Sequence, residues 1–533
     1  MNDKKKIGYQ DEERSPGLRL LKKGQKGLVR AVFSRLGLIV LLLLFQLFVA
    51  LAFLSWLREY LPHFLALSIT FSAFMSLYLL NTDTDPTAKI TWLLVIALLP
   101  VVGAPLYCYT RSNLGVRLLK KRLKFLMETT EDSIPQNDEV FRKLKEESPS
   151  TAALAHYLRR SGCFPVYDNT AVKYFPLGED KWVELLRQLE QAEHFIFMEY
   201  FIIDEGLMWG RVLEILANKA AQGVDVRVMY DGTCEFSTLP HDYPRRLQEL
   251  GIKCKMFAPM SPFVSTHYNY RDHRKICVID GHTAFTGGVN LADEYINRRV
   301  RFGHWKDTAI MLKGEAVRSF TLLFLQMWNV DEPVPEIDPF LKYPCRPQEQ
   351  AKGYVLPYGD CPLDSYKVGE QVYMDILNRA RDYVYIMSPY LILDGEMETA
   401  LKFAAERGVD VRLVLPGIPD KKTPWALAKT HYASLLSSGV KIYEYTPGFV
   451  HAKVFVSDDI KAVVGTINLD YRSLYHHFEC AAYMYGTDCI GDIKADVEAT
   501  IARSATVSGD FMRREKLSIR LLGFLMKALA PLM

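Results

Sequence analysis

The sequence has few of the residue patterns that hold metals or disulfides. Its nine cysteines are scattered from Cys108 to Cys489, and no two of them form a C-x-x-C pair. This distribution is typical of reduced thiols in a cytosolic domain rather than of a disulfide framework or a zinc site. Acidic clusters and Cys/His groups with metal-ligand spacing are also missing. We therefore expect no metal and no other cofactor.

The chain also lacks a strong overall charge. A formal net charge of +3 over 533 residues argues against a general nucleic-acid binder, so no nucleic-acid partner is expected. Basic residues are concentrated locally instead. Lys and Arg outnumber Asp and Glu in residues 1–35, and residues 111–124 are basic without any acidic residue. We interpret residues 1–35 as a basic cytoplasmic tail and residues 111–151 as a basic connector.

The most apolar part of the chain lies between these two basic stretches, in residues 36–110, which we interpret as a membrane segment with two or three hydrophobic helices. Its candidate helices are Leu36–Leu57, Leu61–Leu80 and Ile90–Tyr109. A cleaved signal peptide is disfavoured for the first candidate, because the charged region before it is long and no A-x-A site follows.

The topology of this segment follows from its basic flanks. Lys and Arg favour the cytoplasmic side of a membrane, so we expect both flanks to lie inside the cell. The protein is then an integral, multi-pass protein of the plasma membrane. Three full crossings would separate the flanks. We therefore expect that one of the two later candidates does not fully span, and Ile90–Tyr109 is interrupted by Pro100, Gly103 and Pro105.

The remainder of the chain predicts two similar α/β halves. Gly223-Val-Asp-Val-Arg227 recurs as Gly408-Val-Asp-Val-Arg412, and other strand-like stretches recur in the same order. Such a repeat indicates a duplicated domain, each copy with a parallel or mixed sheet flanked by helices. We expect a first domain at 152–332, a Pro-rich linker at 333–350 and a second domain at 351–510.

Each half carries one copy of the pattern H-x-K-x4-D-x6-G-[GT]-x-N. An equal number of residues separates the two histidines and the two asparagines. A single copy would be weak evidence, since isolated histidines near strands are common. Two copies in a duplicated domain are a strong signal of a shared site, whose candidate residues are His273, Lys275, Asp280 and Asn290 in the first copy and His451, Lys453, Asp458 and Asn468 in the second.

These residue types suit phosphoryl-group chemistry. Period-two alternation in a strand explains the H-x-K spacing, since His and Lys two residues apart point to the same face. A pseudo-two-fold axis can then bring both pairs together. One imidazole can then attack phosphorus while the other protonates the leaving alcohol. The lysines and asparagines would stabilise charge on the phosphoryl oxygens, so the chemistry requires no metal.

The paired pattern resembles the signature of the phospholipase D superfamily. Other stretches resemble bacterial cardiolipin synthases over nearly the whole chain, among them His304-Trp-Lys-Asp-Thr308 and Val464-Gly-Thr-Ile-Asn-Leu-Asp470. Two positions depart from the family pattern. The family usually has Asn where this chain has His477, and Thr where it has Ser388.

The resemblance implies a phosphatidyltransferase that joins two phosphatidylglycerol molecules through a phosphatidyl-histidine and releases glycerol. It also implies that Asp307 and Glu479 orient the catalytic imidazoles, and that the earlier histidine is the nucleophile. Asp280 and Asp458 are expected to hold local structure. A hydrolytic phospholipase D or another phosphatidyltransferase is the alternative, and a non-enzymatic membrane scaffold is disfavoured by the two intact motifs.

The C-terminal residues 511–533 predict a basic amphipathic helix. Leu517, Leu521, Phe524 and Leu525 fall on one helical face, and most basic residues lie elsewhere. Two interpretations are equally favoured. The helix binds an anionic membrane surface, or it packs on the catalytic domain.

Overall fold

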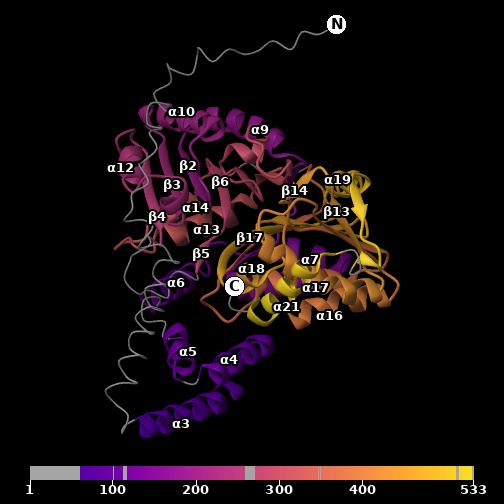
Figure 1. Cartoon of the computed structure of the whole chain (residues 1–533). Helices are drawn as coiled ribbons and strands as arrows, with labels where there is room; N and C mark the ends of the chain where they lie inside the picture. Colours follow the sequence, from indigo (N-terminus) through magenta and orange to yellow (C-terminus); the bar gives the residue numbers. More distant parts are fainter. Residues whose placement is uncertain are drawn as a thin grey trace. The chain divides into compact units, whose positions relative to one another are not determined.

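The structure is a computed structural model that describes residues 61–99, 101–111, 117–258, 270–345, 347–348, 350–511 and 515–530. The predicted basic tail at 1–35 and the candidate helix Leu36–Leu57 lie outside these residues. The described chain divides into a small helical unit and a large α/β unit, which are taken in turn (Figure 1).

The helical unit contains α3 (Leu61–Leu80), α4 (Pro86–Leu98) and α5 (Gly103–Arg111). The third apolar candidate is thus two helices rather than one, with Pro100 outside the described residues. Pro86 starts α4 after Asp85, whose side chain caps it through the N–H of Ala88. The helices enclose a small apolar core of Met75, Leu79, Trp92, Ile96, Ala104 and Tyr107.

Helix α3 has the length and composition of a membrane-crossing segment. Its window His63–Leu80 is the one stretch among the described residues that is long and apolar enough to cross a bilayer. Its polar side chains bond within the helix, since Thr70 Oγ1 donates to Ala66 O and Ser76 Oγ to Ser72 O. Internal satisfaction of polar groups is what a hydrocarbon environment requires.

The large unit begins with three helices, α6 (Arg117–Thr129), α7 (Asp138–Glu147) and α8 (Pro149–Gly162). Two sheets follow, one in each half of the repeat. The first half contains β1 (Thr170–Phe175), β2 (Phe195–Tyr200), β3 (Asp225–Asp231), β4 (Lys253–Phe257), β6 (Lys275–Ile279), β7 (Thr283–Gly287) and β9 (Ala309–Gly314). The second half contains β10 (Tyr354–Asp360), β11 (Tyr383–Met387), β12 (Asp410–Pro416), β13 (Lys441–Tyr445), β15 (Val454–Ser457), β16 (Lys461–Gly465), β17 (His477–Tyr485) and β18 (Ser504–Thr506).

The two sheets share one strand order. It is β1-β9-β7-β6-β2-β3-β4 in the first half and β10-β17-β16-β15-β11-β12-β13 in the second, where β18 adds an edge. In both sheets the last three shared strands run parallel and the other shared neighbours antiparallel. The predicted fold class, a duplicated domain with a mixed sheet flanked by helices, is confirmed.

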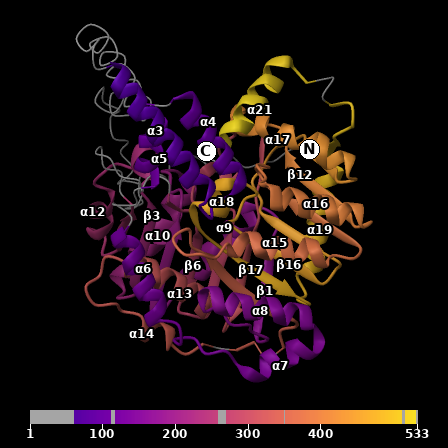
Figure 2. The same cartoon turned by 90° about the horizontal axis from the view of Figure 1, so that it is seen from below.

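Helices cover these sheets. Figure 1 shows α9 and α10 above the first sheet and α13 below it. The helices of the first half are α9 (Gly178–Glu190), α10 (Leu207–Ala221), α11 (Cys234–Ser237), α12 (Tyr243–Gln248), the 3-10 turn η3 (Asp293–Ile296), α13 (Val317–Trp328) and α14 (Asp338–Leu341). Those of the second half are α15 (Val368–Arg379), α16 (Gly395–Glu406), α17 (Lys422–Ser437), α18 (Tyr471–Tyr475), α19 (Ile490–Ala502) and α21 (Leu517–Leu529), several of which are seen from below in Figure 2.

Helix α13 is the apolar layer that joins the two halves. It contacts β6, β7 and β9 of the first sheet and β10 of the second. Nearly every residue from Val317 to Trp328 is buried, which agrees with a helix that is apolar on most of its surface. The two halves therefore form one packed body around the motif strands.

Two short strand pairs also connect the halves. Strand β5 (Arg271–Asp272) of the first half pairs in parallel with the start of β17, and β8 (His304–Lys306) pairs in parallel with β14 (Gly448–Val450) of the second half. Both β5 and β14 end immediately before a motif histidine. These crossed pairs position the candidate active site.

Helix α21 packs on the α/β unit, as one of the two interpretations of the C-terminal segment predicts. A Cβ on its buried Gly523 would clash with Ala426 O of α17, so the two helices are in close contact there. Phe524 and Leu525 nevertheless remain exposed, as do Leu517 and Leu521. The helix thus packs on the α/β unit through a small residue and presents its large apolar side chains outward.

Candidate active site

The backbone of each motif histidine is held by the other half. His273 follows β5, and its N–H donates to Phe478 O at 2.9 Å. His451 follows β14, and its N–H donates to Lys306 O at 2.7 Å. The two histidines therefore occupy equivalent places, each at the end of a short strand that belongs to one half and pairs with the other.

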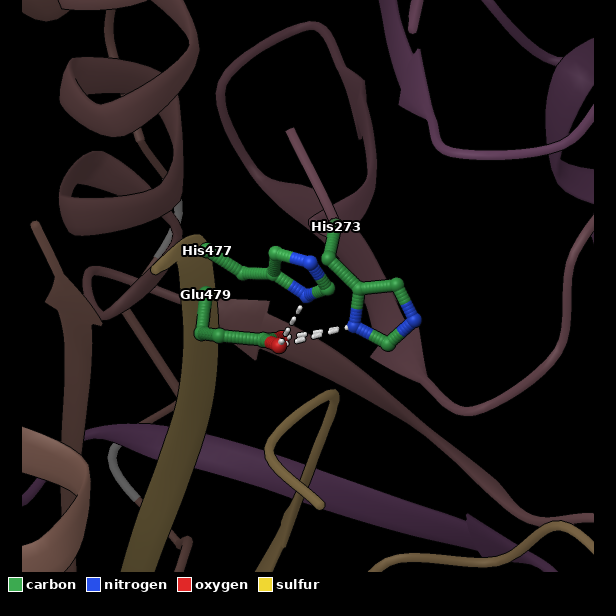
Figure 3. A group of neighbouring side chains, drawn as sticks. All are labelled: His273, His477 and Glu479. Atoms are coloured by element: carbon green, nitrogen blue, oxygen red, sulfur yellow. Dashed lines mark hydrogen bonds and ion pairs between the residues drawn. The ribbon is translucent and has the colours of Figure 1, made fainter. Parts of the chain in front are cut away.

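The side chain of each motif histidine also reaches across to a carboxylate. His273 Nδ1 lies 2.8 Å and 2.9 Å from the two carboxylate oxygens of Glu479 (Figure 3). His451 Nδ1 lies 2.7 Å from Asp307 Oδ2. Both carboxylates are fully buried. The geometry thus brings together the four residues as two crossed His–carboxylate pairs.

These bonds determine which ring nitrogen is available. A carboxylate accepts the Nδ1–H of a neutral imidazole, which leaves the lone pair on Nε2. In Figure 3 the second ring nitrogen of His273 points away from Glu479. His273 and His451 are 6% and 8% exposed, so the rings are almost enclosed but still accessible. Each is therefore prepared to react or exchange a proton through Nε2.

The motif lysines lie against the histidines, although the two residue types do not alternate along one strand. Lys275 Nζ donates to His273 O at 2.6 Å, and Lys453 Nζ lies 2.9 Å from His451 Nδ1. The prediction that His and Lys alternate within one strand was wrong. His273 precedes β6 and both His451 and Lys453 lie between β14 and β15, because the chain crosses between the halves at these points.

Burial of this group of charges shifts the pKa values of its members. Burial lowers the pKa of Lys275 to about 8 and that of Lys453 to about 7, although Asp307 and Glu479 oppose the shift. Burial and then the charge of Lys453 lower the pKa of His451 to about 4. Burial likewise holds the pKa of His273 well below its usual value. Both imidazoles are thus neutral near pH 7.

The variable position of the motif, G-[GT], is explained by the two carboxylates. A Cβ on Gly288 would clash with Oδ1 of Asp307, so the first half requires glycine. The second half has Thr466, whose hydroxyl donates to Glu479 Oε2 and whose Oγ1 accepts the N–H of Cys480 at 3.0 Å. The Thr466 hydroxyl helps to orient Glu479, a role that sequence reasoning did not assign.

The two motif asparagines differ in their surroundings. Asn290 Oδ1 accepts the N–H of Ile202 at 3.0 Å, and its Nδ2 donates to the Tyr295 hydroxyl at 2.8 Å. Asn468 is buried, and its Oδ1 has no hydrogen-bond partner among the described residues. Asn468 therefore has more freedom to contact a ligand, whereas Asn290 is held largely by protein groups.

The motif aspartates lie at the opposite end of their strands from the lysines. Asp280 accepts the N–H groups of Glu193, His194 and Phe195, each at 2.8 Å. Asp458 accepts those of Arg381, Asp382 and Tyr383, each at 3.0 Å. Each aspartate thereby fixes the start of a central strand, β2 or β11.

A third histidine lies beside the first pair. His477 Nδ1 is 3.6 Å from Glu479 Oε1, and the ring centroids of His477 and His273 are 5.3 Å apart (Figure 3). His477 and Glu479 are two residues apart in β17, so strand alternation places their side chains on the same face. Alternation of this kind did not explain the H-x-K spacing. The spacing of His477 and Glu479 was the signal that could have found the group.

Two groups of side chains have donor atoms close enough for a metal ion. His273, His477 and Glu479 form one, and their ligand atoms lie within 4.8 Å of one another. Glu370, Asp394 and Glu396 form the other, where Lys367 Nζ is already 3.4 Å from Glu370. Sequence spacing links His477 with Glu479 in β17 and Asp394 with Glu396 at the start of α16, but the third donor of each group, His273 or Glu370, comes from a separate element.

An apolar cavity adjoins the second motif. Its empty volume is about 320 Å³, and its lining includes Tyr390, Pro416, Trp425 and Phe449. The ring centroids of Phe449 and His451 are 5.8 Å apart. The cavity therefore presents apolar side chains beside the second motif histidine.

The duplicated sheet and the crossed His–carboxylate pairs define a class, the paired-histidine enzymes of the phospholipase D type. Comparison with known proteins agrees. The family model described as "Cardiolipin synthase, PLD-like domain" matches residues 185–328 and 373–501, and the model "Phospholipase_D-nuclease N-terminal" matches residues 69–108.

Relatives extend this similarity over most of the chain. A cardiolipin synthase of Alkalihalophilus pseudofirmus is 32% identical, with 92% of this chain and 98% of the relative covered. One of Halalkalibacterium halodurans is also 32% identical, over 86% of this chain and 92% of the relative. An uncharacterized protein of Streptococcus mutans is 59% identical over 86% of this chain and 99% of its own length.

A solved structure shows the same fold. The phosphatidylserine synthase of Haemophilus influenzae aligns with a TM-score of 0.56 and 14% identity, covering 73% of this chain and 98% of that one. The chain belongs to the cardiolipin synthase family of the phospholipase D superfamily. It is a phosphatidyltransferase of the phospholipase D type.

The lowered lysine pKa values predict how activity depends on pH. Lys453 and Lys275 are cationic below about 7 and about 8 respectively and lose their protons above those values. An anionic phosphodiester binds the cationic form better, so kcat/KM for a phospholipid substrate should fall as pH rises through this range. Initial rates at low substrate concentration across the range measure this fall. A flat profile would show that the lysines remain charged in the free enzyme.

Proposed function

We propose that the enzyme transfers a phosphatidyl group from one phosphatidylglycerol to another, which yields cardiolipin and glycerol. The observation that carries this proposal is the pair of crossed His–carboxylate contacts, His273 with Glu479 and His451 with Asp307. Two imidazoles that are held by carboxylates at Nδ1 and can react through Nε2 suit a double displacement, in which one forms a covalent bond and the other moves a proton. The names of the relatives supply the substrate class.

In the first step, His273 Nε2 attacks the phosphorus of the donor lipid. The bond from phosphorus to the head-group glycerol oxygen breaks, and His451 Nε2–H gives its proton to that oxygen. Free glycerol leaves, and the diacylglycerol phosphate remains on His273 as a phosphatidyl-histidine. Because His451 is neutral in the free enzyme, it must gain this proton when the anionic phosphodiester arrives and favours the cationic ring.

In the second step, a hydroxyl of the head-group glycerol of the acceptor lipid attacks the same phosphorus. His451 accepts the hydroxyl proton, the P–N bond breaks and His273 is released. Lys275, Lys453 and Asn468 stabilise the charge on the non-bridging oxygens in both steps. Water in place of the lipid alcohol would give phosphatidic acid, so the nature of the acceptor decides between a transferase and a hydrolase reaction.

The arrangement at the membrane is part of the proposal. The apolar stretch Leu36–Leu57 and helix α3 both cross the bilayer, which leaves the basic flanks and the catalytic halves, at 152–332 and 351–510, on the cytoplasmic side of the plasma membrane. The apolar face of α21 contacts the lipid surface, and its basic residues attract anionic lipid. The exposed side chains of Leu517, Phe524 and Leu525 support this placement.

The products test the reaction directly. Purified enzyme mixed with phosphatidylglycerol in the presence of a chelator should release glycerol and form cardiolipin, since the lysines supply the positive charge. Mass spectrometry of the lipids identifies the product. Phosphatidic acid as the main product would establish hydrolysis instead, and loss of activity that a divalent ion restores would contradict the metal-independent mechanism.

The division of roles between the histidines predicts different responses to the leaving group. Glycerol is a poor leaving group, so both His273→Ala and His451→Ala should be inactive on phosphatidylglycerol. A phosphatidyl ester of nitrophenol needs little protonation as the bond breaks. His451→Ala should therefore retain a burst of nitrophenol release on that ester, and His273→Ala should not.

The burst also identifies the covalent residue. Stoichiometric nitrophenol with a phosphatidyl adduct on His273 is expected in the His451→Ala variant, measured by mass spectrometry of peptides. A burst of nitrophenol in His273→Ala but not in His451→Ala would mean that His451 is the nucleophile and His273 the general acid. Equal loss in both variants would mean that each histidine does more than this division allows.

The topology can be tested on intact cells. Protease added outside should leave the chain uncut between Ala152 and Asp510, and the same protease should cut there after the cells are permeabilised. Fragments are detected with a tag at the C-terminus. Cleavage in that range in intact cells would place the catalytic halves outside.

A further inference from the structure

We propose that His273, His477 and Glu479 form a binding site for a zinc-like divalent ion, and that occupation of this site switches the enzyme off. The inhibition rests on the role of His273 proposed above, whereas binding of the ion does not. The site contains the donors that zinc prefers, two imidazole nitrogens and one carboxylate, all buried and within 4.8 Å of one another.

The state of His477 is the observation that points to a ligand. The side chain is buried, at 8% exposure of the residue, yet neither ring nitrogen has a hydrogen-bond partner among the described residues. Its Nδ1 faces Glu479 from 3.6 Å, longer than a hydrogen bond. A buried imidazole that has a carboxylate nearby but no hydrogen-bond partner forfeits stabilisation that a bound ion would restore.

The distances between donors are close to those of a zinc site. Zn–N and Zn–O bonds of about 2.0–2.2 Å in a tetrahedron place neighbouring donor atoms roughly 3.3–3.6 Å apart. Nδ1 of His477 already lies 3.6 Å from Glu479 Oε1, and Nδ1 of His273 lies 2.8 Å from it. Separation of the second pair by about half an ångström would admit the ion, and a water or a phosphate oxygen could complete the tetrahedron.

Inhibition follows from the position of one proton. A neutral imidazole carries one ring N–H, which in His273 is directed to Glu479 from Nδ1. An ion that binds Nδ1 requires the other tautomer, in which Nδ1 gives its lone pair to the ion and the proton has moved from Nδ1 to Nε2. The Nε2 lone pair that attacks phosphorus is then absent, so the phosphatidyl-histidine cannot form.

The charges of the site limit this binding to ions that ligate nitrogen well. Lys275 and Lys453 act against any cation, while Glu479 and Asp307 attract it. A hard ion such as Mg²⁺ prefers oxygen donors and keeps its waters, and it gains little from two imidazoles. Zinc and cobalt should therefore inhibit at concentrations where Mg²⁺ has no effect.

The direct test measures zinc bound to the full-length protein in detergent by equilibrium dialysis and metal analysis. Wild type should bind one ion more than His477→Asn, which keeps a polar side chain of similar reach but removes one ligand. His451→Asn, the same change at the other motif histidine, should retain the ion. Equal zinc in wild type and His477→Asn, or loss of the ion in His451→Asn, would refute the site.

The functional test compares inhibition by zinc, with each protein normalised to its own rate in chelator. The zinc concentration for half-inhibition should rise at least about tenfold in His477→Asn, in line with the loss of one ligand. It should not change in His241→Asn, whose side chain is 80% exposed and pairs with Glu235 instead of a motif residue. Unchanged inhibition in His477→Asn would overturn the switch. Bound zinc without inhibition would retain the site and remove the proposed role of His273.

Discussion

The contact between each motif histidine and a carboxylate of the other half is the constraint on which the site depends. Glu479 and Asp307 are fully buried, and each accepts a hydrogen bond from an imidazole whose backbone N–H donates to the residue just before that carboxylate, Phe478 or Lys306. Neither half contains a complete histidine site by itself. Duplication, the crossed strand pairs β5–β17 and β8–β14, and the buried helix α13 all serve this one arrangement.

Burial then determines the electrostatics of the site. The lysines are held where water cannot fully solvate them, and burial lowers their pKa values and those of both histidines. A phosphodiester anion near these groups favours the protonated form of the lysines and of an imidazole beside it. Neutral histidines before binding are suited to nucleophilic attack, and the arriving anion favours the proton that the leaving group requires.

The two halves have diverged where their carboxylates differ. The first half uses Asp307 and needs Gly288 to make room for it, and the second half uses the longer Glu479 with Thr466 as an additional donor. His477 adds a further imidazole to the Glu479 side alone. These differences give His273 and His451 distinct surroundings. They are the physical basis for proposing that the two histidines act in different ways and that only His273 lies at a metal site.

Sequence alone determined much of this protein. The repeated H-x-K-x4-D pattern established the duplication, because equal spacing in two copies is independent of the fold. The apolar residues of Leu61–Leu80 predicted a helix that α3 matches in its bounds.

The tertiary structure decided what a local sequence pattern cannot express. Strand alternation did not place His273 beside Lys275, since the chain crosses between sheets there, and no spacing rule links residue 273 to 479 or 451 to 307. The proximity of His477 to His273 likewise arises from the β5–β17 pairing, a contact between segments roughly two hundred residues apart that is formed only when the two halves pack.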